Sequence, residues 1–144
     1  MAEQLELPLP VSAVIPAPEI RNSRRLRGKT AYLSGLAAEE SVVRLYNARG
    51  MGLMAKRWRG SCAEIDLILK DGAVVVFVEV KKSSSFDAAL LSLGRAQRRR
   101  IALAALEYLG RTGLGQLTDI RFDLAMVNDI GAVAILENAF GEDE

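Results

Sequence analysis

The chain contains 144 residues, which is the size of a single domain, with 50% apolar and 26% charged residues. This composition is typical of a globular protein and excludes a disordered, collagen-like or disulfide-framework chain. Histidine is absent, so catalytic triads, His-containing zinc sites and histidine general bases are excluded as well. Carboxylates, lysines, tyrosines and one cysteine, Cys62, are left to carry any chemistry.

Three features of the sequence predict a cytoplasmic protein without a membrane partner. The longest apolar runs, such as that from Ala73 to Val78, are far shorter than the roughly 20 residues that span a membrane. The N-terminus is acidic and lacks the basic-then-apolar start of a secretory signal. A lone cysteine forms no internal disulfide, as is usual in a reducing compartment.

The charges are unevenly distributed, although the net charge is only +1. Residues 21–60 contain ten basic and two acidic side chains, whereas residues 1–20 and 111–144 are net acidic. A strongly basic segment next to a stretch that contains several carboxylates suggests a polyanionic partner held near an acidic site. A solvated basic face without a partner is the alternative.

The sequence predicts one folded domain over residues 29–138 with a tail at each end. All four prolines lie within the first 18 residues, and a basic connector follows from Arg21 to Lys29. Residues 1–28 are therefore expected to form a flexible tail. Residues 139–144 are expected to form an acidic C-terminal tail.

The first predicted element is a helix over residues 30–47, followed by Gly50 as a C-terminal stop. Its apolar residues fall on one arc of roughly half the helix circumference. Glu39 lies in the middle of this arc, where an unpaired carboxylate would cost several kcal/mol. Glu39 is therefore expected to have a partner or a metal ion.

The remaining elements are predicted from apolar periodicity and turn residues. Strands are expected over 51–58, 65–70, 73–81, 119–127 and 132–136, a loop over 83–89 and a helix over 90–109. The resulting order, α-β-β-β-α-β-β, is typical of a single α/β domain with a mixed β-sheet flanked by helices.

An Asp71-Gly72 pair between two β-rich runs predicts a tight hairpin. With these two as the turn residues, Lys70 pairs with Ala73, Glu64 with Glu79 and Asp66 with Phe77. Because side chains alternate along a strand, one face is predicted to carry the ionisable residues and the other only apolar ones. The ionisable face has Glu64, Asp66, Glu79 and Lys81, and the apolar face has Ile65, Leu67, Leu69, Val74, Val76, Val78 and Val80.

Asp66 and Glu79 are close enough in this arrangement to share a ligand. Like carboxylates repel one another unless a cation neutralises them, and oxygen ligands without His or Cys favour Mg²⁺ or Mn²⁺. Lys81 points to the same side and can hold an attacking water or offset charge on phosphorus. An Asp followed by Glu-x-Lys is thus a complete set for metal-assisted phosphodiester hydrolysis, and the alternative is a polar strand end with its charges in water.

The same residues resemble the core of a known family. The matching segments are Glu64-Ile65-Asp66-Leu67-Ile68 and Val76-Phe77-Val78-Glu79-Val80-Lys81. They resemble the YraN-like endonuclease family, which is similar to the PD-(D/E)xK, restriction-endonuclease-like nucleases, and the resemblance extends from Gly35 to Asp123. Two residues depart from the family pattern, since Ala63 replaces a usual glycine and Gln97 a usual lysine.

The resemblance implies a restriction-endonuclease-like fold and a role for each residue of the motif. Asp66, Glu79 and the backbone carbonyl of Val80 are expected to hold Mg²⁺ or Mn²⁺, with Lys81 as the catalytic lysine. Glu39 is expected to be the helix carboxylate near the site, and Glu64 a supporting residue.

Contacts with nucleic acid are expected from basic residues around this site, namely Arg57, Arg59, Arg95, Arg98, Arg99 and Arg100. The leading interpretation is a Mg²⁺-dependent endonuclease that acts on duplex or branched DNA. The alternatives are a catalytically weak or inactive nucleic-acid-binding module on the same fold, and a protein-interaction subunit. Symmetric cleavage of both strands would need two active sites, which suggests a homodimer.

Overall fold

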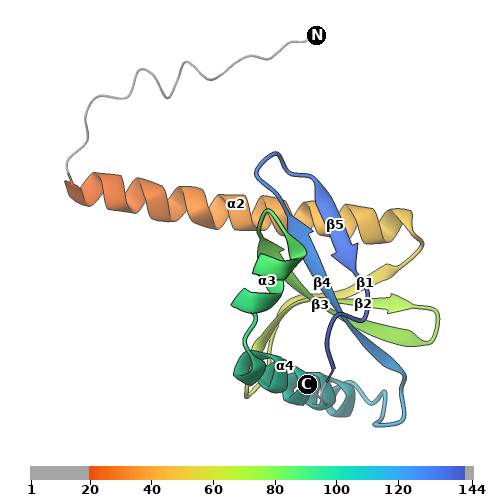
Figure 1. The fold of residues 1–144 in the computed structure, drawn as a ribbon. Helices are drawn as coiled ribbons and strands as arrows, with labels where there is room; N and C mark the ends of the chain where they lie inside the picture. Colours follow the sequence, from red (N-terminus) through yellow and green to blue (C-terminus); the bar gives the residue numbers. More distant parts are fainter. Residues whose placement is uncertain (1–19, 142–144) are drawn as a thin grey trace. The chain divides into compact units, whose positions relative to one another are not determined.

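A computed structural model describes residues 20–141 of the chain. The chain divides into two units, residues 1–34 and 35–144, and the second contains the sheet (Figure 1). In chain order the elements are α2 (Ile20–Ala48), β1 (Gly52–Arg59), β2 (Glu64–Asp71), β3 (Val74–Lys82), α3 (Phe86–Ser92), α4 (Arg95–Arg111), β4 (Ile120–Val127) and β5 (Val133–Leu136). Among these residues, no helix is both long enough and apolar enough to cross a membrane.

The five strands form one mixed sheet in the order β1-β2-β3-β4-β5. β3 and β4 are parallel and the other neighbours are antiparallel. Parallel neighbours need a crossover connection, and α3 and α4 provide it (Figure 1). The predicted α/β class is confirmed, and the architecture is consistent with a restriction-endonuclease-like fold.

The core consists of two apolar clusters. In one, residues of α4 such as Ile101 and Tyr108 pack with Ile68 and Phe77 of the sheet. In the other, residues of the C-terminal half of α2 pack with the opposite set of strand side chains. That set contains Leu67, Leu69, Val76 and Val78. The site residues lie on strands whose central parts are buried on both faces, which limits their movement.

The predicted N-terminal boundary is wrong for residues 20–28. They belong to α2 and not to a flexible tail, because the last proline is Pro18 and none interrupts the helix before Ala48. Residues 1–19, the rest of the predicted tail, lie outside the described residues.

The predicted C-terminal tail is also corrected. Phe140 is only 2% exposed and stacks on Phe122 of β4, with 5.2 Å between the ring centroids. The chain from residue 139 to 141 is therefore attached to the core, and residues 142–144 lie outside the described part.

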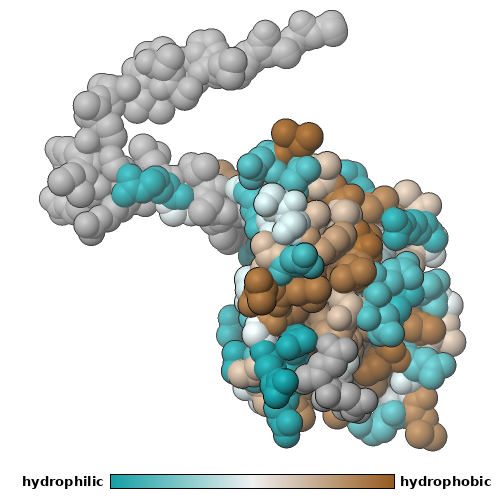
Figure 2. All heavy atoms as spheres, in the orientation of Figure 1, coloured by the Kyte–Doolittle hydropathy of each residue, from teal (hydrophilic) through white to brown (hydrophobic). Residues whose placement is uncertain are grey.

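The predicted loop over 83–89 contains the start of an additional helix. The Ser85 side chain accepts a hydrogen bond from the Ala88 N–H at 3.1 Å, which caps α3. α3 then ends before Gly94, so the helix predicted over 90–109 is two helices. Figure 2 shows apolar side chains over the part of the compact unit where α3 and β5 lie, interspersed with polar ones.

The hairpin register differs from the predicted one by two residues. Asp71 pairs with Val74, and the turn consists of Gly72 and Ala73. Gly72 has a φ of +61°, and a glycine at the first central position is what a type II′ turn requires. The predicted pairs of Asp66 with Phe77 and of Lys70 with Ala73 are therefore wrong, because Phe77 faces Ile68 and Val75 faces Lys70.

Candidate active site

The candidate site lies at the open end of the β2–β3 hairpin. Regular pairing ends where Leu67 faces Val78. Beyond this pair, Oδ2 of Asp66 accepts a hydrogen bond from the Val80 backbone N–H at 2.8 Å. The Asp66 side chain thus satisfies the Val80 backbone N–H at the place where the regular ladder of backbone hydrogen bonds stops. This hydrogen bond holds the Asp66 carboxylate between the two strands.

Strict alternation fails at this point of β2. Ile65 was predicted to share a face with Leu67, but it packs in the cluster of Ile68 while Leu67 packs in the opposite one. The predicted apolar face is therefore wrong at Ile65. The irregularity falls at Asp66, the residue between Ile65 and Leu67, so the carboxylate is displaced from a regular strand position.

Glu79 is a buried carboxylate, only 7% exposed. Its Oε2 accepts a hydrogen bond from Gln97 Nε2 of α4 at 3.2 Å and lies 3.6 Å from Lys81 Nζ. Its Oε1 is buried without a hydrogen-bond partner among the described residues. Such an oxygen is costly to leave unsatisfied, so Oε1 is available for a ligand that is not part of the chain.

Asp66 and Glu79 are coupled carboxyl groups. Burial, together with the charge of Asp66, raises the pKa of Glu79 to about 8, against the opposing charge of Lys81. Burial also raises the pKa of Asp66. The hydrogen bond from the Val80 N–H opposes this shift, and the charge of Glu39 adds to it. Without a cation the pair therefore retains a proton at neutral pH.

The donors at this site fit a hard divalent cation. Mg²⁺ is usually bound through one or two carboxylates and keeps several water ligands. Within residues 20–141, no three acidic or cysteine side chains gather as a metal-binding group. The side chains that could hold the ion are Asp66 and Glu79, and the orphaned Oε1 of Glu79 is the observation in favour of this fit. The backbone carbonyl of Val80 stays a predicted ligand.

Glu39 lies near the pair but has its own partner. Its Oε1 accepts a hydrogen bond from Arg57 Nε of β1 at 3.0 Å, and its side chain is only 13% exposed. Its charge acts on Asp66, so α2 does bring a carboxylate to the site. Arg57, which the sequence analysis expected to bind nucleic acid, is the residue that contacts Glu39.

Glu64 and Arg59 form an ion pair at the rim. They face each other across β1 and β2, and Arg59 Nη2 lies 3.0 Å from Glu64 Oε1. Both are solvent-accessible, since the side chains of Arg59 and Glu64 are 79% and 36% exposed. The structure therefore brings together Asp66, Glu79, Lys81 and Glu39, with Glu64 outside this set.

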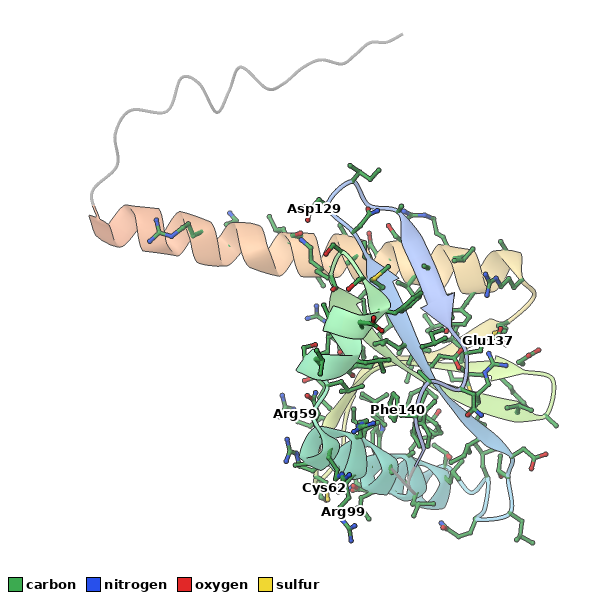
Figure 3. The ribbon with its side chains drawn as sticks, viewed as in Figure 1. Arg59, Cys62, Arg99, Asp129, Glu137 and Phe140 are labelled. Atoms are coloured by element: carbon green, nitrogen blue, oxygen red, sulfur yellow. The ribbon has the colours of Figure 1, made fainter. Side chains whose placement is uncertain are left out.

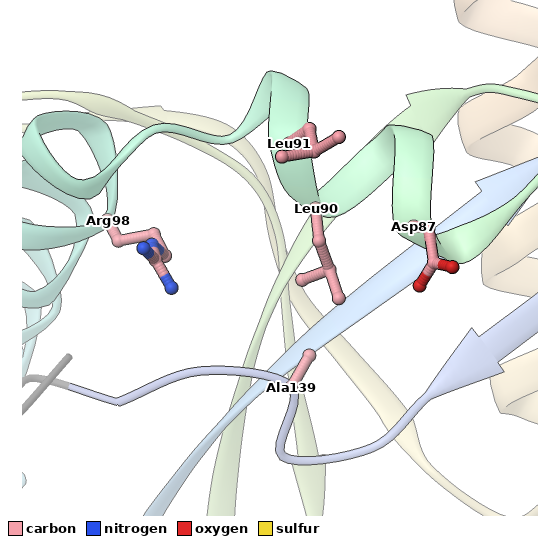
Figure 4. A pocket seen from close by; sticks show the side chains of 5 residues that line it. All are labelled: Asp87, Leu90, Leu91, Arg98 and Ala139. Carbon is pink, nitrogen blue, oxygen red and sulfur yellow. The ribbon is translucent and has the colours of Figure 1, made fainter.

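The arginines of α4 lie in the first turns of the same helix that contacts Glu79. Arg95, Arg99 and Arg100 are exposed, whereas Arg98 is half-buried. Figure 3 shows Arg59 and Arg99 projecting outward at the end of the molecule where α4 lies. Arg98 lines a cavity of ≈ 570 Å³ together with Asp87, Leu90, Leu91 and Ala139 (Figure 4).

Gln97 is the site residue whose contact the sequence analysis missed. The sequence analysis considered it only as a replacement for a usual lysine, yet it donates a hydrogen bond to Glu79. The signal was its spacing, because Gln97 precedes Ile101, Ala104 and Tyr108 by four, seven and eleven residues. These three are buried, so Gln97 begins the buried stripe of α4.

The fold and the site together define an α/β protein of the restriction-endonuclease-like class. The sequence profile described as "Uncharacterised protein family UPF0102" matches residues 38–127, which include all four clustered site residues. The chain belongs to this family, which the sequence analysis identified by its resemblance to YraN-like proteins.

Curated relatives carry the same family name. A UPF0102 protein of Roseobacter denitrificans is 50% identical over 121 residues, which cover 84% of this chain and 94% of the relative. One of Ruegeria pomeroyi is 52% identical over 115 residues, which cover 80% and 94%. One of Cereibacter sphaeroides is 49% identical over 115 residues, which cover 80% and 98%.

Proposed function

We propose that this protein is a Mg²⁺- or Mn²⁺-dependent endonuclease that hydrolyses phosphodiester bonds of DNA. The observation that carries the proposal is the buried Glu79, whose Oε1 has no partner in the described chain and whose neighbour is Asp66. A site built only for stability would pair that oxygen. A carboxylate pair that retains a proton is instead ready to exchange it for a cation.

Each residue has a separate task in this proposal. Bound at Asp66 and Glu79, the ion would polarise a phosphate oxygen and lower the pKa of a coordinated water. Lys81, with its side chain 25% exposed, reaches both the buried carboxylate and solvent. It would orient the water and offset the negative charge that grows on the phosphate oxygens. Gln97 keeps Glu79 Oε2 occupied, so that Oε1 is directed to the ion.

The test is cleavage of plasmid, linear duplex and branched DNA with Mg²⁺ or Mn²⁺. Lys81→Ala should abolish cleavage while leaving DNA affinity and the melting temperature nearly unchanged, because its contribution belongs mainly to the transition state. Lys82→Ala is the matched control, since it removes the same charge from the next residue. Equal cleavage by wild type and Lys81→Ala would refute the assigned role of the lysine.

The second candidate is a nucleic-acid-binding module on the same fold. It is favoured by one observation, the lack of a three-carboxylate metal group within residues 20–141. Wild-type protein that binds DNA but cleaves none of the three substrates would establish this alternative.

A further inference from the structure

Arg57 has a strained backbone in the middle of an edge strand. Its φ is +50°, and in the described part of the chain only Asn138 among the other non-glycine residues has a positive φ. This region is unfavourable for a large L-residue, and the surrounding structure must maintain it. Strain of this kind is often found at functional sites, so the contacts of Arg57 need an explanation.

The strain is located at the level of Asp66. The pairs on either side of Arg57 are Lys56 with Leu67 and Trp58 with Ile65. Arg57 therefore lies across the β1–β2 ladder from Asp66. Ala55 and Trp58, three residues apart, both pack into the cluster that contains Ile65, so β1 loses its alternation at the same level as β2.

The side chain of Arg57 is directed to Glu39. Its Nε lies 3.0 Å from Glu39 Oε1, and the two side chains are 34% and 13% exposed. Glu39 is also close enough to Asp66 to act on its charge. Glu39 is thus the carboxylate that α2 contributes next to the Asp66–Glu79 pair, and a cation of the chain, Arg57, holds it.

We propose that Arg57 is a positioning residue that holds Glu39 beside the Asp66–Glu79 pair and prevents it from becoming a third metal ligand. The inference rests on the proposed function, because it concerns the same metal site. Two carboxylates leave coordination positions for water and a phosphate oxygen. A third carboxylate would tighten metal binding and occupy one of these positions.

Calorimetric titration with Mn²⁺, without DNA, tests this role in a double-mutant cycle. The proteins are wild type, Arg57→Ala, Glu39→Gln and the double variant. An additional carboxylate ligand strengthens the binding of a hard cation, so Arg57→Ala should bind Mn²⁺ about tenfold more tightly than wild type. The double variant should bind like Glu39→Gln, because the freed carboxylate is no longer present.

Two further variants distinguish a positioning role of Arg57 from a general effect of positive charge and from a loss of folding. Arg59→Ala removes the same charge two residues away, from a side chain that is 79% exposed, and should change the Mn²⁺ affinity little. Arg57→Gly should keep the fold even if Arg57→Ala destabilises it, because glycine adopts a positive φ without strain. It should show the same gain in affinity as Arg57→Ala.

The outcomes distinguish this inference from the proposed function. If wild type binds Mn²⁺ and Arg57→Gly binds no more tightly, or if the gain persists without Glu39, the positioning role is overturned and the metal site stands. If Asp66→Ala binds Mn²⁺ as well as wild type, the metal site itself is wrong, and the positioning role is overturned with it.

Discussion

Replacing Glu79 by glutamine should remove a large pH dependence of stability. The pKa of Glu79 is raised to about 8 from its ordinary value of 4.5, mainly by burial and then by the charge of Asp66. Glutamine has the same shape and resembles the protonated carboxyl group. Its side-chain oxygen can accept the hydrogen bond from Gln97, and its NH₂ group can donate a hydrogen bond to Asp66.

The sign and size follow from proton linkage. A carboxyl group with a raised pKa binds its proton more tightly in the folded state. Its contribution to the stability of the fold is therefore fully present below pH 4.5 and is lost as the pH rises towards 8. Each unit of pKa difference corresponds to about 1.4 kcal/mol. Since Glu79 titrates together with Asp66, the free energy of unfolding should fall by roughly 3–5 kcal/mol across this window.

Urea denaturation at pH 5 and pH 9, in the presence of EDTA, measures this effect. Wild type should lose stability relative to Glu79→Gln between the two values, and at pH 9 the variant should be the more stable protein. Replacing the EDTA by excess Mn²⁺ at pH 9 should restore stability to wild type more than to the variant, because the ion binds only the folded state. Parallel pH profiles of the two proteins would refute the buried, coupled pair.

Glu107→Gln provides a control with the opposite sign. The Ser61 N–H donates to Glu107 at 2.7 Å and lowers the pKa of this carboxyl group. The contribution of Glu107 to stability is therefore present above the ordinary pKa of a glutamate and is lost on acidification. This variant should be less stable than wild type at neutral pH and should approach it as the pH falls.

Two other predictions concern the core and the basic surface. Tyr46→Phe removes a 2.7 Å hydrogen bond to the fully buried Asp123 and should cost about 1–3 kcal/mol in urea denaturation without changing Mn²⁺ affinity. Arg99→Ala/Arg100→Ala should flatten the slope of log affinity for duplex DNA against log salt by ~0.9 for each lost phosphate contact. Arg111→Ala, at the other end of α4, should leave that slope unchanged. If Arg111→Ala flattened the slope as much as Arg99→Ala/Arg100→Ala, a DNA-binding patch at the start of the helix would be contradicted.

The sequence alone determined the strands and the α/β class, and it predicted the chemical set of the site. Strand alternation and the Asp71-Gly72 signal depend on neighbours in the chain, and they led to Asp66, Glu79 and Lys81. The helical spacing around Glu39 was equally local, and it indicated correctly that this carboxylate has a partner. Identifying the partner as Arg57 required the structure, because β1 and α2 meet only in the folded chain.

The tertiary structure decided the details on which the chemistry depends. The register shifted by two residues because Gly72 takes the first central position of the turn. Ile65 left its predicted face because β2 packs against two different clusters there. Gln97 reached Glu79 because α4 covers one face of the sheet. Such contacts join segments far apart in the chain, so apolar periodicity, which reports only neighbours within one element, contains no information about them.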